Sequence, residues 1–349
     1  MLTGLMRYGG SAAKVRTLYG QCLTAEDFRR MASMKSIPEV TAFLESHPAW
    51  HHELAGLDPA GTHRRQLEDI LRRGMLNEHL RIYNFMSSSG AELYEEPILR
   101  IEQEEILSCY SSIRAGKAGA YTPKLPDALR KQSKIDFSAL SACSSWASLL
   151  SAVSKTDFYP MLSRLRIPES GLPWYASVEW AMQTYVFTRL FNTAKKLAGG
   201  DAGRTMEAYA GTQVDLINIS RVMRIKNYFP EAYHEYIDLL LPFSGKVSTA
   251  FLRDLYNAPD EAAAYRILLR SPYKKIFAKT KYRYTEEYYF HYLYDFSKRM
   301  LRTPVPSAFT VIAYLNLKEI EVQNIIKVTE CVRYGKTPES AGVYLTGLL

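Results

Sequence analysis

A pattern of apolar residues at helical spacing recurs in this sequence about every 110 residues, and it rules out more folds than any other feature. Shifting the segment that begins at Phe28 by 109 residues places it on the segment that begins at Phe137. Seven apolar residues then fall on seven apolar residues without a gap: Phe28/Phe137, Met31/Leu140, Met34/Cys143, Ile37/Trp146, Val40/Leu149, Leu44/Val153 and Trp50/Tyr159. A further shift of 115 residues reaches Leu252, where the agreement is weaker. Self-similarity at a fixed period indicates one helical unit used several times.

A second block repeats in step with the first. Each copy has an acid, a polar residue three positions later, and an arginine six to nine positions beyond that. The copies are Glu105/Ser108/Arg114, Asp215/Asn218/Arg224 and Glu321/Asn324/Arg333. Two independent blocks at similar offsets make chance matching between amphipathic helices the weaker explanation. We therefore predict three helical units, over residues 1–120, 121–232 and 233–349.

Helical signals dominate the whole chain, so the predicted fold class is all-α. Thr24 and Ser36 each precede an acid by three residues, which is the signature of a capping box. These signals predict two short helices with a tight bend over residues 24–46. Longer helices are predicted over residues 63–87, 91–115, 172–198, 204–228, 285–302 and 306–330. Strand-like alternation is rare, and Pro and Gly cluster between the predicted helices.

Length and composition are those of a soluble protein that folds without a structural metal or disulfide bonds. The 349 residues are 47% hydrophobic, which suffices for a substantial core without metal or disulfides. The four cysteines are far apart and no CxxC pair exists, so we expect reduced thiols. The N-terminus lacks the apolar stretch of a signal peptide. Residues 137–154 are uncharged but rich in serine, so we expect any membrane association to be peripheral.

The formal net charge of +8 favours anionic partners: nucleic acid, acidic protein surfaces or anionic lipid. One segment, residues 274–296, interleaves basic residues with aromatic ones. Its basic residues are Lys274, Lys275, Lys279, Lys281 and Arg283. They could bind nucleic acid through phosphate contacts and stacking, or face an acidic protein or anionic lipid. The simpler interpretation is a helix whose tyrosines line a core and whose lysines are solvated.

No motif for catalysis or cofactor binding is present. The glycine-rich segment 199–205 has neither the spacing nor the lysine of a phosphate-binding loop, so no nucleotide is expected. His47, His51 and His52 do not form a metal-binding motif, and no metal is expected. No arrangement of a nucleophile with a histidine stands out. The Asp215/Asn218/Arg224 and Glu321/Asn324/Arg333 sets are interpreted as structural, with each acid pairing with its arginine inside a helical bundle.

Three segments carry a resemblance to a known family, and together they span nearly the whole chain. They are AKVR at residues 13–16 with LT at 23–24 and DF at 27–28, DLINI at 215–219 with RIK at 224–226, and the C-terminal set. That set comprises PS at 306–307, AYL at 313–315, LKE at 317–319 and EVQNI at 321–325. The sequence resembles the central-stalk subunit called C in bacterial and archaeal V/A-type ATPases and d in the eukaryotic vacuolar enzyme. Residues 51–100 and 160–173 depart from the family pattern.

The resemblance implies an all-helical funnel of three similar units around a pseudo-threefold axis. It implies a non-catalytic connector, without cofactors, that couples the rotating shaft to the membrane proteolipid ring for proton or sodium transport. Its partners would be the shaft subunits of the D and F type and the ring, on the cytoplasmic face of the membrane. Two other functions stay open: a basic helical-repeat protein that binds nucleic acid, and an enzyme with an unrecognised site in a central cavity.

Overall fold

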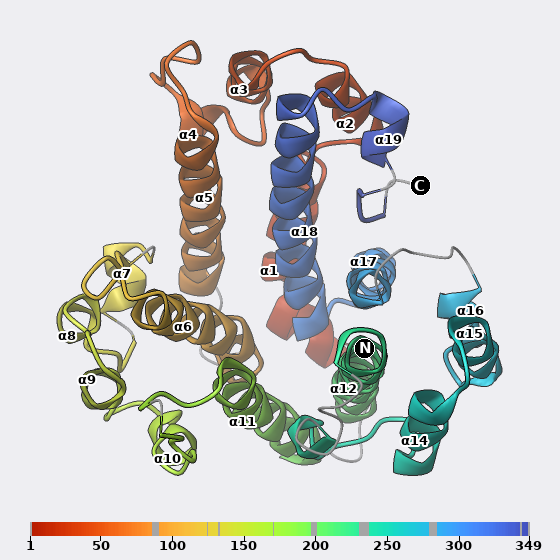
Figure 1. Ribbon diagram of the computed structural model, residues 1–349. Coiled ribbons are helices and arrows are strands. Elements are labelled where there is room, and N and C mark those ends of the chain that lie inside the picture. Colours follow the sequence, from red (N-terminus) through yellow and green to blue (C-terminus); the bar gives the residue numbers. More distant parts are fainter. Residues whose placement is uncertain are drawn as a thin grey trace. The chain divides into compact units, whose positions relative to one another are not determined.

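The computed structural model describes residues 2–85, 91–123, 125–131, 133–169, 171–196, 201–229, 237–278, 285–342 and 344–347. Every regular element in these ranges is helical, so the predicted all-α class is confirmed (Figure 1). None of the described helices combines the length and apolar character that a bilayer span requires.

All but one of the long helices match the predicted ranges closely. The long helices are α1 (Leu2–Tyr19), α5 (Arg64–Phe85), α6 (Ala91–Arg114), α11 (Tyr175–Lys196), α12 (Asp201–Tyr228), α17 (Glu286–Arg302) and α18 (Ala308–Arg333). The first of these, α1, was not predicted, because its sequence contains glycines at positions 4, 9 and 10 and shows no strong apolar stripe. The others begin and end within a few residues of the predicted bounds.

The short helices come in sets of three. The first set is α2 (Ala25–Ala32), α3 (Ile37–Ser46) and α4 (His51–Leu54). The second is α8 (Phe137–Ser141), α9 (Trp146–Ala152) and α10 (Tyr159–Leu162), and the third is α14 (Thr249–Asn257), α15 (Glu261–Arg270) and α16 (Lys274–Phe277). The remaining short elements are α7 (Asp127–Arg130), η3 (Ile237–Leu239) and α19 (Pro338–Gly342). The recurring apolar pattern in the sequence therefore corresponds to these three sets.

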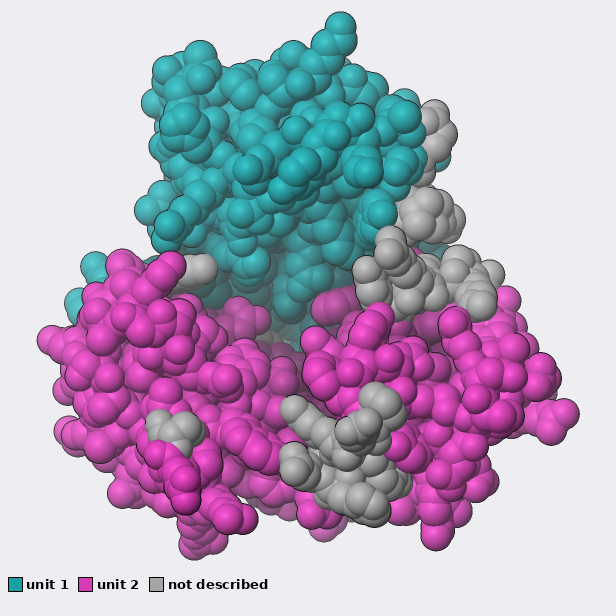
Figure 2. Space-filling model, viewed as in Figure 1, with its two compact units in different colours: residues 1–94, 124–131, 293–349 teal, residues 95–123, 132–292 magenta. Residues whose placement is uncertain are grey.

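The chain divides into two compact units, which Figure 2 colours separately. Unit 1 comprises residues 1–94, 124–131 and 293–349, and unit 2 comprises residues 95–123 and 132–292. The divisions fall inside α6 and α17. The three-unit division over 1–120, 121–232 and 233–349 stays a prediction.

Side-chain caps explain where the short helices begin. The Thr24 hydroxyl accepts from the Asp27 amide at 3.2 Å, and the Asp27 carboxylate accepts from the Thr24 amide at 2.8 Å, which completes the predicted capping box. The Ser36 hydroxyl accepts from the Glu39 amide at 3.4 Å, but the Glu39 carboxylate accepts from the amide of Lys35 at 3.0 Å. In the second predicted capping box, the carboxylate therefore binds the amide of the residue before the N-cap rather than that of the N-cap residue itself.

Unit 1 is organised around α18, whose buried residues are spread over its whole circumference. It packs against α1, α2, α3, α5 and α19. A helix that is apolar on all sides is a core helix. The largest fully buried side chains of this unit include Trp50 and Leu54 from the first set of short helices and Leu67 and Leu71 from α5. The helix α18 thus forms the centre of a unit in which all outer helices but α19 come from the N-terminal part of the chain.

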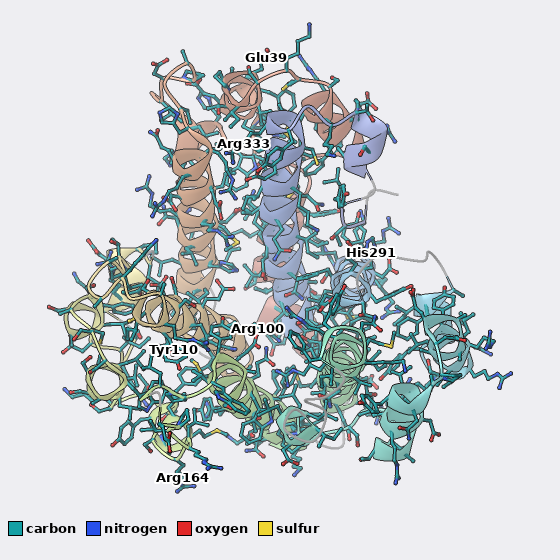
Figure 3. The ribbon with its side chains drawn as sticks, viewed as in Figure 1. Glu39, Arg100, Tyr110, Arg164, His291 and Arg333 are labelled. Atoms are coloured by element: carbon teal, nitrogen blue, oxygen red, sulfur yellow. The ribbon has the colours of Figure 1, made fainter. Side chains whose placement is uncertain are left out.

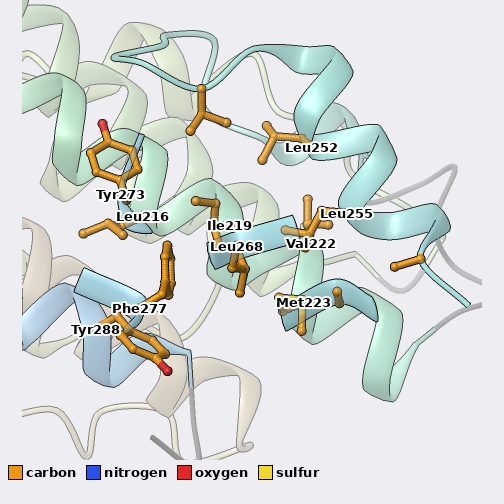
Figure 4. Packing of buried hydrophobic residues seen from close by; sticks show 13 residues of the cluster. Leu216, Ile219, Val222, Met223, Leu252, Leu255, Leu268, Tyr273, Phe277 and Tyr288 are labelled. Carbon is orange, nitrogen blue, oxygen red and sulfur yellow. The ribbon is translucent and has the colours of Figure 1, made fainter. Parts of the chain in front are cut away.

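Unit 2 has α11 and α12 packed side by side, with α10 against α11 and α14 against α12. One face of α12 contributes Leu216, Ile219 and Val222 to a cluster that the third set of short helices covers (Figure 4). From that set come Leu252, Leu255, Leu268 and Phe277 among others. Burying each such side chain contributes about 1.5–3 kcal/mol.

The segment that precedes α14 packs directly against α12 through a contact between Gly245 and Gly211. A Cβ on Gly211 would lie 2.8 Å from the Cα of Gly245, and a Cβ on Gly245 would lie 2.6 Å from the carbonyl of Gly211. Real Cβ contacts of this kind do not occur, so both positions need glycine for the close approach of two backbones. The approach places the Gly245 amide within reach of the Asp215 carboxylate, at 2.9 Å.

Replacing Gly211 by alanine is expected to lower the free energy of unfolding by about 1–3 kcal/mol, because the added methyl group overpacks this contact. The matched control is Gly9→Ala in α1, where nothing lies within 4 Å of the new Cβ. There the better helix propensity of alanine should stabilise by about 0.5–1 kcal/mol. Urea denaturation of both variants tests this; destabilisation of equal size in both would contradict the role of the glycine contact.

Candidate functional site

Three long helices each carry a buried acid that receives hydrogen bonds from the chain leading into a set of short helices. The acids are Asp215 on α12, Glu321 on α18 and Glu102 on α6, with exposed fractions of 2%, 5% and 8%. Buried carboxylates are costly unless hydrogen bonds and cations satisfy them. Their partners therefore show what each acid holds in place.

Asp215 accepts four hydrogen bonds within unit 2. One carboxylate oxygen takes the amide of Gly245 at 2.9 Å, and the other takes the amides of Lys246 at 2.6 Å and Val247 at 3.0 Å. The second oxygen also takes the hydroxyl of Tyr273 at 2.6 Å. Burial and this carboxylate raise the pKa of Tyr273, so its hydroxyl stays a donor. The acid thus fixes both ends of the third set of short helices.

Glu321 makes the same kind of contacts within unit 1. Its carboxylate takes the amide of Leu23 at 2.8 Å and the indole N–H of Trp50 at 3.1 Å. Leu23 and Val247 stand directly before the N-cap residues of α2 and α14, and Trp50 and Tyr273 are the N-cap residues of α4 and α16. The two acids therefore hold equivalent points of two sets of short helices.

Glu321 differs from Asp215 because it also has a buried cationic partner. The ammonium of Lys318 lies 2.8 Å from Glu321, 3.7 Å from Glu78 and 4.0 Å from the centre of the Trp50 ring. Burial opposes the charge of Lys318, but the carboxylates of Glu321 and Glu78 outweigh it and raise the pKa of the lysine. The Tyr314 hydroxyl donates to Glu78 at 2.5 Å. A charged cluster of two acids and one lysine is thus enclosed inside unit 1.

The acid on α6 that corresponds to Asp215 is Glu102. Ser133 donates to Glu102 at 2.5 Å and accepts from the amide of Ile135 at 3.1 Å, so the serine relays the contact that Asp215 makes directly. Ile135 stands directly before Asp136, the N-cap residue of α8. The N-cap residue of α10 is Phe158, whose side chain has no polar atom to offer. Burial raises the pKa of Glu102.

The polar residue three positions after each acid holds the chain that follows the long helix. Asn218 donates to the carbonyl of Leu241 at 3.1 Å and accepts from its amide at 2.8 Å. Asn324 does the same with Thr346, at 3.0 and 2.9 Å. On α6 the polar residue three positions after the acid is Glu105, which accepts a hydrogen bond from the Tyr121 hydroxyl. The first copy of the block is therefore Glu102/Glu105, and the predicted pairing of Glu105 with Asp215 and of Ser108 with Asn218 is wrong by three residues.

The arginines of the predicted sets do not pair with the acids. Arg224 is exposed on α12, while both oxygens of Asp215 are held by amides and a tyrosine. Arg333 lies 3.7 Å from Glu330 and over the ring of Tyr334, at the end of α18. The expectation of acid–arginine pairs inside a bundle is therefore wrong. Arg333, in the last turn of α18, instead complements the dipole of that helix.

Sequence reasoning missed Lys318, Glu78 and Trp50 as partners of the C-terminal acid. Lys318 lies three residues before Glu321, the spacing of neighbours on one helix face, so this signal was available. Nothing local indicates Trp50, which lies 271 residues away from Glu321 in the sequence.

Comparison with known proteins decides the family. The model of the ATP synthase (C/AC39) subunit family matches residues 11–342, nearly the whole chain. The chain belongs to this family. Members of this family are structural subunits of the ATP synthase rather than its catalytic part.

One curated relative is the C subunit of the A-type ATP synthase from Methanococcoides burtonii. It is 23% identical to this chain over 237 residues, which cover 67% of the chain and 63% of the relative. The match thus spans slightly less than two thirds of the relative's length.

Of the five basic residues predicted as partner or membrane contacts, the structure describes two. Lys274 and Lys275 are exposed on α16, whereas Lys279, Lys281 and Arg283 lie outside the described residues. Two tyrosines of the same region, Tyr273 and Tyr288, are 5% and 3% exposed and lie in the core of unit 2. The interpretation of a helix with core tyrosines and solvated lysines therefore agrees with the described part of the segment.

The described residues contain no group of three or more His, Cys, Asp and Glu side chains that could hold a metal ion. Two of the histidines outside any motif have local partners: His47 lies 3.7 Å from Asp27, and the His51 ring contacts the carbonyl of Glu45 at 2.8 Å. The four cysteines are free thiols, and burial raises the pKa of Cys109 to about 12. Such a thiol is a poor nucleophile at neutral pH.

A buried histidine on α5 makes the stability of this protein sensitive to acid. Burial lowers the pKa of His79 from 6.5 to about 4, so the folded state holds the ring neutral. The unfolded chain takes up a proton as the pH falls below 6.5. The contribution of His79 to stability is therefore complete above pH 6.5 and falls by roughly 3 kcal/mol towards pH 4.

His79→Gln is expected to flatten the pH dependence of unfolding between pH 7 and 4. The control is His52→Gln, which changes an exposed histidine nearby in the chain. Urea midpoints measured across this range test the prediction, and identical slopes for the His79 variant and the parent would contradict it.

Proposed function

We propose that this chain is the central-stalk connector of a V/A-type rotary ATPase. It joins shaft subunits of the D and F type to the membrane proteolipid ring on the cytoplasmic face, and it couples rotation to proton or sodium transport. The observation that carries the proposal is the family match over residues 11–342. The name of the archaeal relative, which is the C subunit of an A-type ATP synthase, supports it.

The buried acids support a mechanical role. A connector under torque must resist bending, and its helices must not slide along one another. Asp215 and Glu321 each tie the entry of a short-helix set, and the start of its third helix, to one long helix. Fully hydrogen-bonded buried polar groups specify one arrangement, because any slippage leaves them unsatisfied. This construction suits a part that transmits force.

The repeated buried acids also support the three-unit funnel as a proposal. Each of α6, α12 and α18 carries an acid that serves one set of short helices and a polar residue that holds the chain beyond the helix. The last long helix, α18, serves the first short-helix set. Such closure between the two ends of the chain is what a ring of three repeats requires. We therefore retain three similar units around a pseudo-threefold axis.

The experiment is purification of the affinity-tagged full chain from a cell that makes the whole ATPase. The proposal expects the shaft subunits and the proteolipid ring to co-purify in fixed proportion. Loss of the chain should leave the catalytic head separated from the ring. A head and ring that stay together without it would overturn the connector role. Co-purification with nucleic acid alone would instead favour the basic helical-repeat alternative, which no described feature specifically supports.

A further inference from the structure

Exposed apolar side chains gather in the chain from α10 to the beginning of α11. Tyr159, Ile167, Trp174 and Tyr175 have exposed fractions of 38%, 52%, 47% and 37%. Single exposed apolar residues are normal on protein surfaces, but a concentration of large ones marks an interaction site. We call these four residues, together with Arg164 and Arg166, the α10–α11 surface.

The backbone that carries this surface is held in place. Leu162 is fully buried at the end of α10, and the carbonyl of Pro173 accepts a hydrogen bond from the Tyr110 hydroxyl. The ring of Tyr175 stacks on that of Tyr110 at 6.3 Å, and the Gly171 amide closes a turn onto Pro168 at 2.9 Å. The exposed apolar side chains are therefore presented to solvent from a fixed scaffold.

Positive charge accompanies the aromatic side chains. Arg164 and Arg166 are exposed, and neither forms an ion pair with another described residue. Figure 3 shows Arg164 at the surface beside α10. Three acids lie nearby in the chain. Asp157 lies 3.4 Å from Lys134, Glu179 acts on Arg221 of α12, and Glu169 forms no ion pair with another described residue. The surface thus offers two guanidinium groups to an anionic partner.

We propose that the α10–α11 surface rests on anionic lipid headgroups. Tryptophan and tyrosine prefer the interface between bilayer and water, and basic residues beside them attract the anionic leaflet. The two exposed arginines complement the negative charge of an anionic leaflet. Arginine, tryptophan and tyrosine also occur together in protein interfaces, so an acidic protein is the other occupant that the test distinguishes. The inference rests on the proposed function, because a connector seated on a membrane ring lies close to lipid.

The test uses the isolated full chain and phosphatidylcholine vesicles with or without phosphatidylserine. Co-sedimentation is expected only with the anionic vesicles, and raising the salt concentration should weaken it because the attraction is electrostatic.

Tryptophan fluorescence localises the contact to this surface. Trp174 is exposed, whereas Trp50 and Trp146 are buried and the indole N–H of Trp180 is held by the carbonyl of Leu240 at 3.0 Å. The emission should therefore shift to the blue through Trp174 when anionic vesicles are added. The variant Trp174→Phe should lose the shift while the chain still sediments.

Two variants separate this surface from the basic segment on α16. Arg164→Gln with Arg166→Gln removes two charges and should weaken vesicle binding about thirtyfold. The control, Lys274→Gln with Lys275→Gln, removes two exposed charges elsewhere and should leave binding within about twofold. Circular dichroism of both variants checks that the fold is retained.

Three results would overturn the inference: no binding to anionic vesicles, loss of binding in the α16 variant only, or capture of a soluble acidic subunit by this surface. None of them affects the connector role, because assembly with shaft and ring is measured separately. If the chain binds anionic vesicles but does not assemble with the shaft and the ring, the proposed function is overturned, whereas the lipid contact of the α10–α11 surface is supported.

Discussion

Asp215→Ala is expected to lower the free energy of unfolding of unit 2 by about 3–5 kcal/mol, because two buried donors and two part-buried donors lose their acceptor at once. The amides of Gly245, Lys246 and Val247 and the hydroxyl of Tyr273 all lose their acceptor. Asp215→Asn should cost less, since one carbonyl oxygen remains to accept.

Hydrogen exchange measured by mass spectrometry localises the effect. In Asp215→Ala, residues 245–258 should exchange faster while α18 in unit 1 keeps its protection. The control is Glu207→Ala, an exposed acid on the same helix, with an expected effect within about 0.5 kcal/mol. Equal exchange in residues 245–258 of the parent and the Asp215 variant would show that the acid does not hold the third short-helix set.

Lys318→Met is expected to destabilise unit 1 by about 3–5 kcal/mol, because it leaves the buried carboxylate of Glu321 and the part-buried carboxylate of Glu78 without their cation. Methionine has nearly the volume of lysine, so the loss reports charge rather than packing. The comparison variant is Lys336→Met, an exposed lysine just beyond α18, where a change within about 0.5 kcal/mol is expected.

A double-mutant cycle measures the coupling in this cluster. Glu321→Gln in the Lys318→Met background should cost less than Glu321→Gln in the parent, because the charge that it removes no longer has a partner. Urea denaturation of the four proteins supplies the cycle. Additive losses would mean that the ammonium and the carboxylate act independently, despite their separation of 2.8 Å.

The sequence was sufficient to predict the long helices other than α1, because their boundaries depend on local chemistry. Thr24 capped α2 as its spacing to Asp27 indicated, and the long helices followed their apolar periodicity. The exception was α1, which is held by contacts far along the chain: Arg16 donates to the carbonyl of Leu301 at 3.1 Å. A helix stabilised by tertiary packing carries a weaker local signal.

Asp215 and Glu321 could be predicted from the repeat, but most of their partners could not; the exception is Lys318, three residues before Glu321. Backbone amides carry no sequence signature, and Leu23 lies 298 residues from Glu321. The register error on α6 has a similar cause. Acids stand at positions 102, 104 and 105 there, and only the contact through Ser133 identifies Glu102 as the counterpart of Asp215. Arg333 was wrongly assigned to its acid because helix ends also select arginine, and Arg224 because a basic residue on the exposed side of a helix has the same spacing.

A ratio of ion transport to ATP hydrolysis, measured in reconstituted vesicles, tests the connector role most directly. The ATPase is assembled with the parent chain, without the chain, and with the chain added back. The account predicts that hydrolysis continues without the chain while ion transport is lost, and that adding the chain back restores transport. Full transport per ATP hydrolysed in its absence would contradict the account.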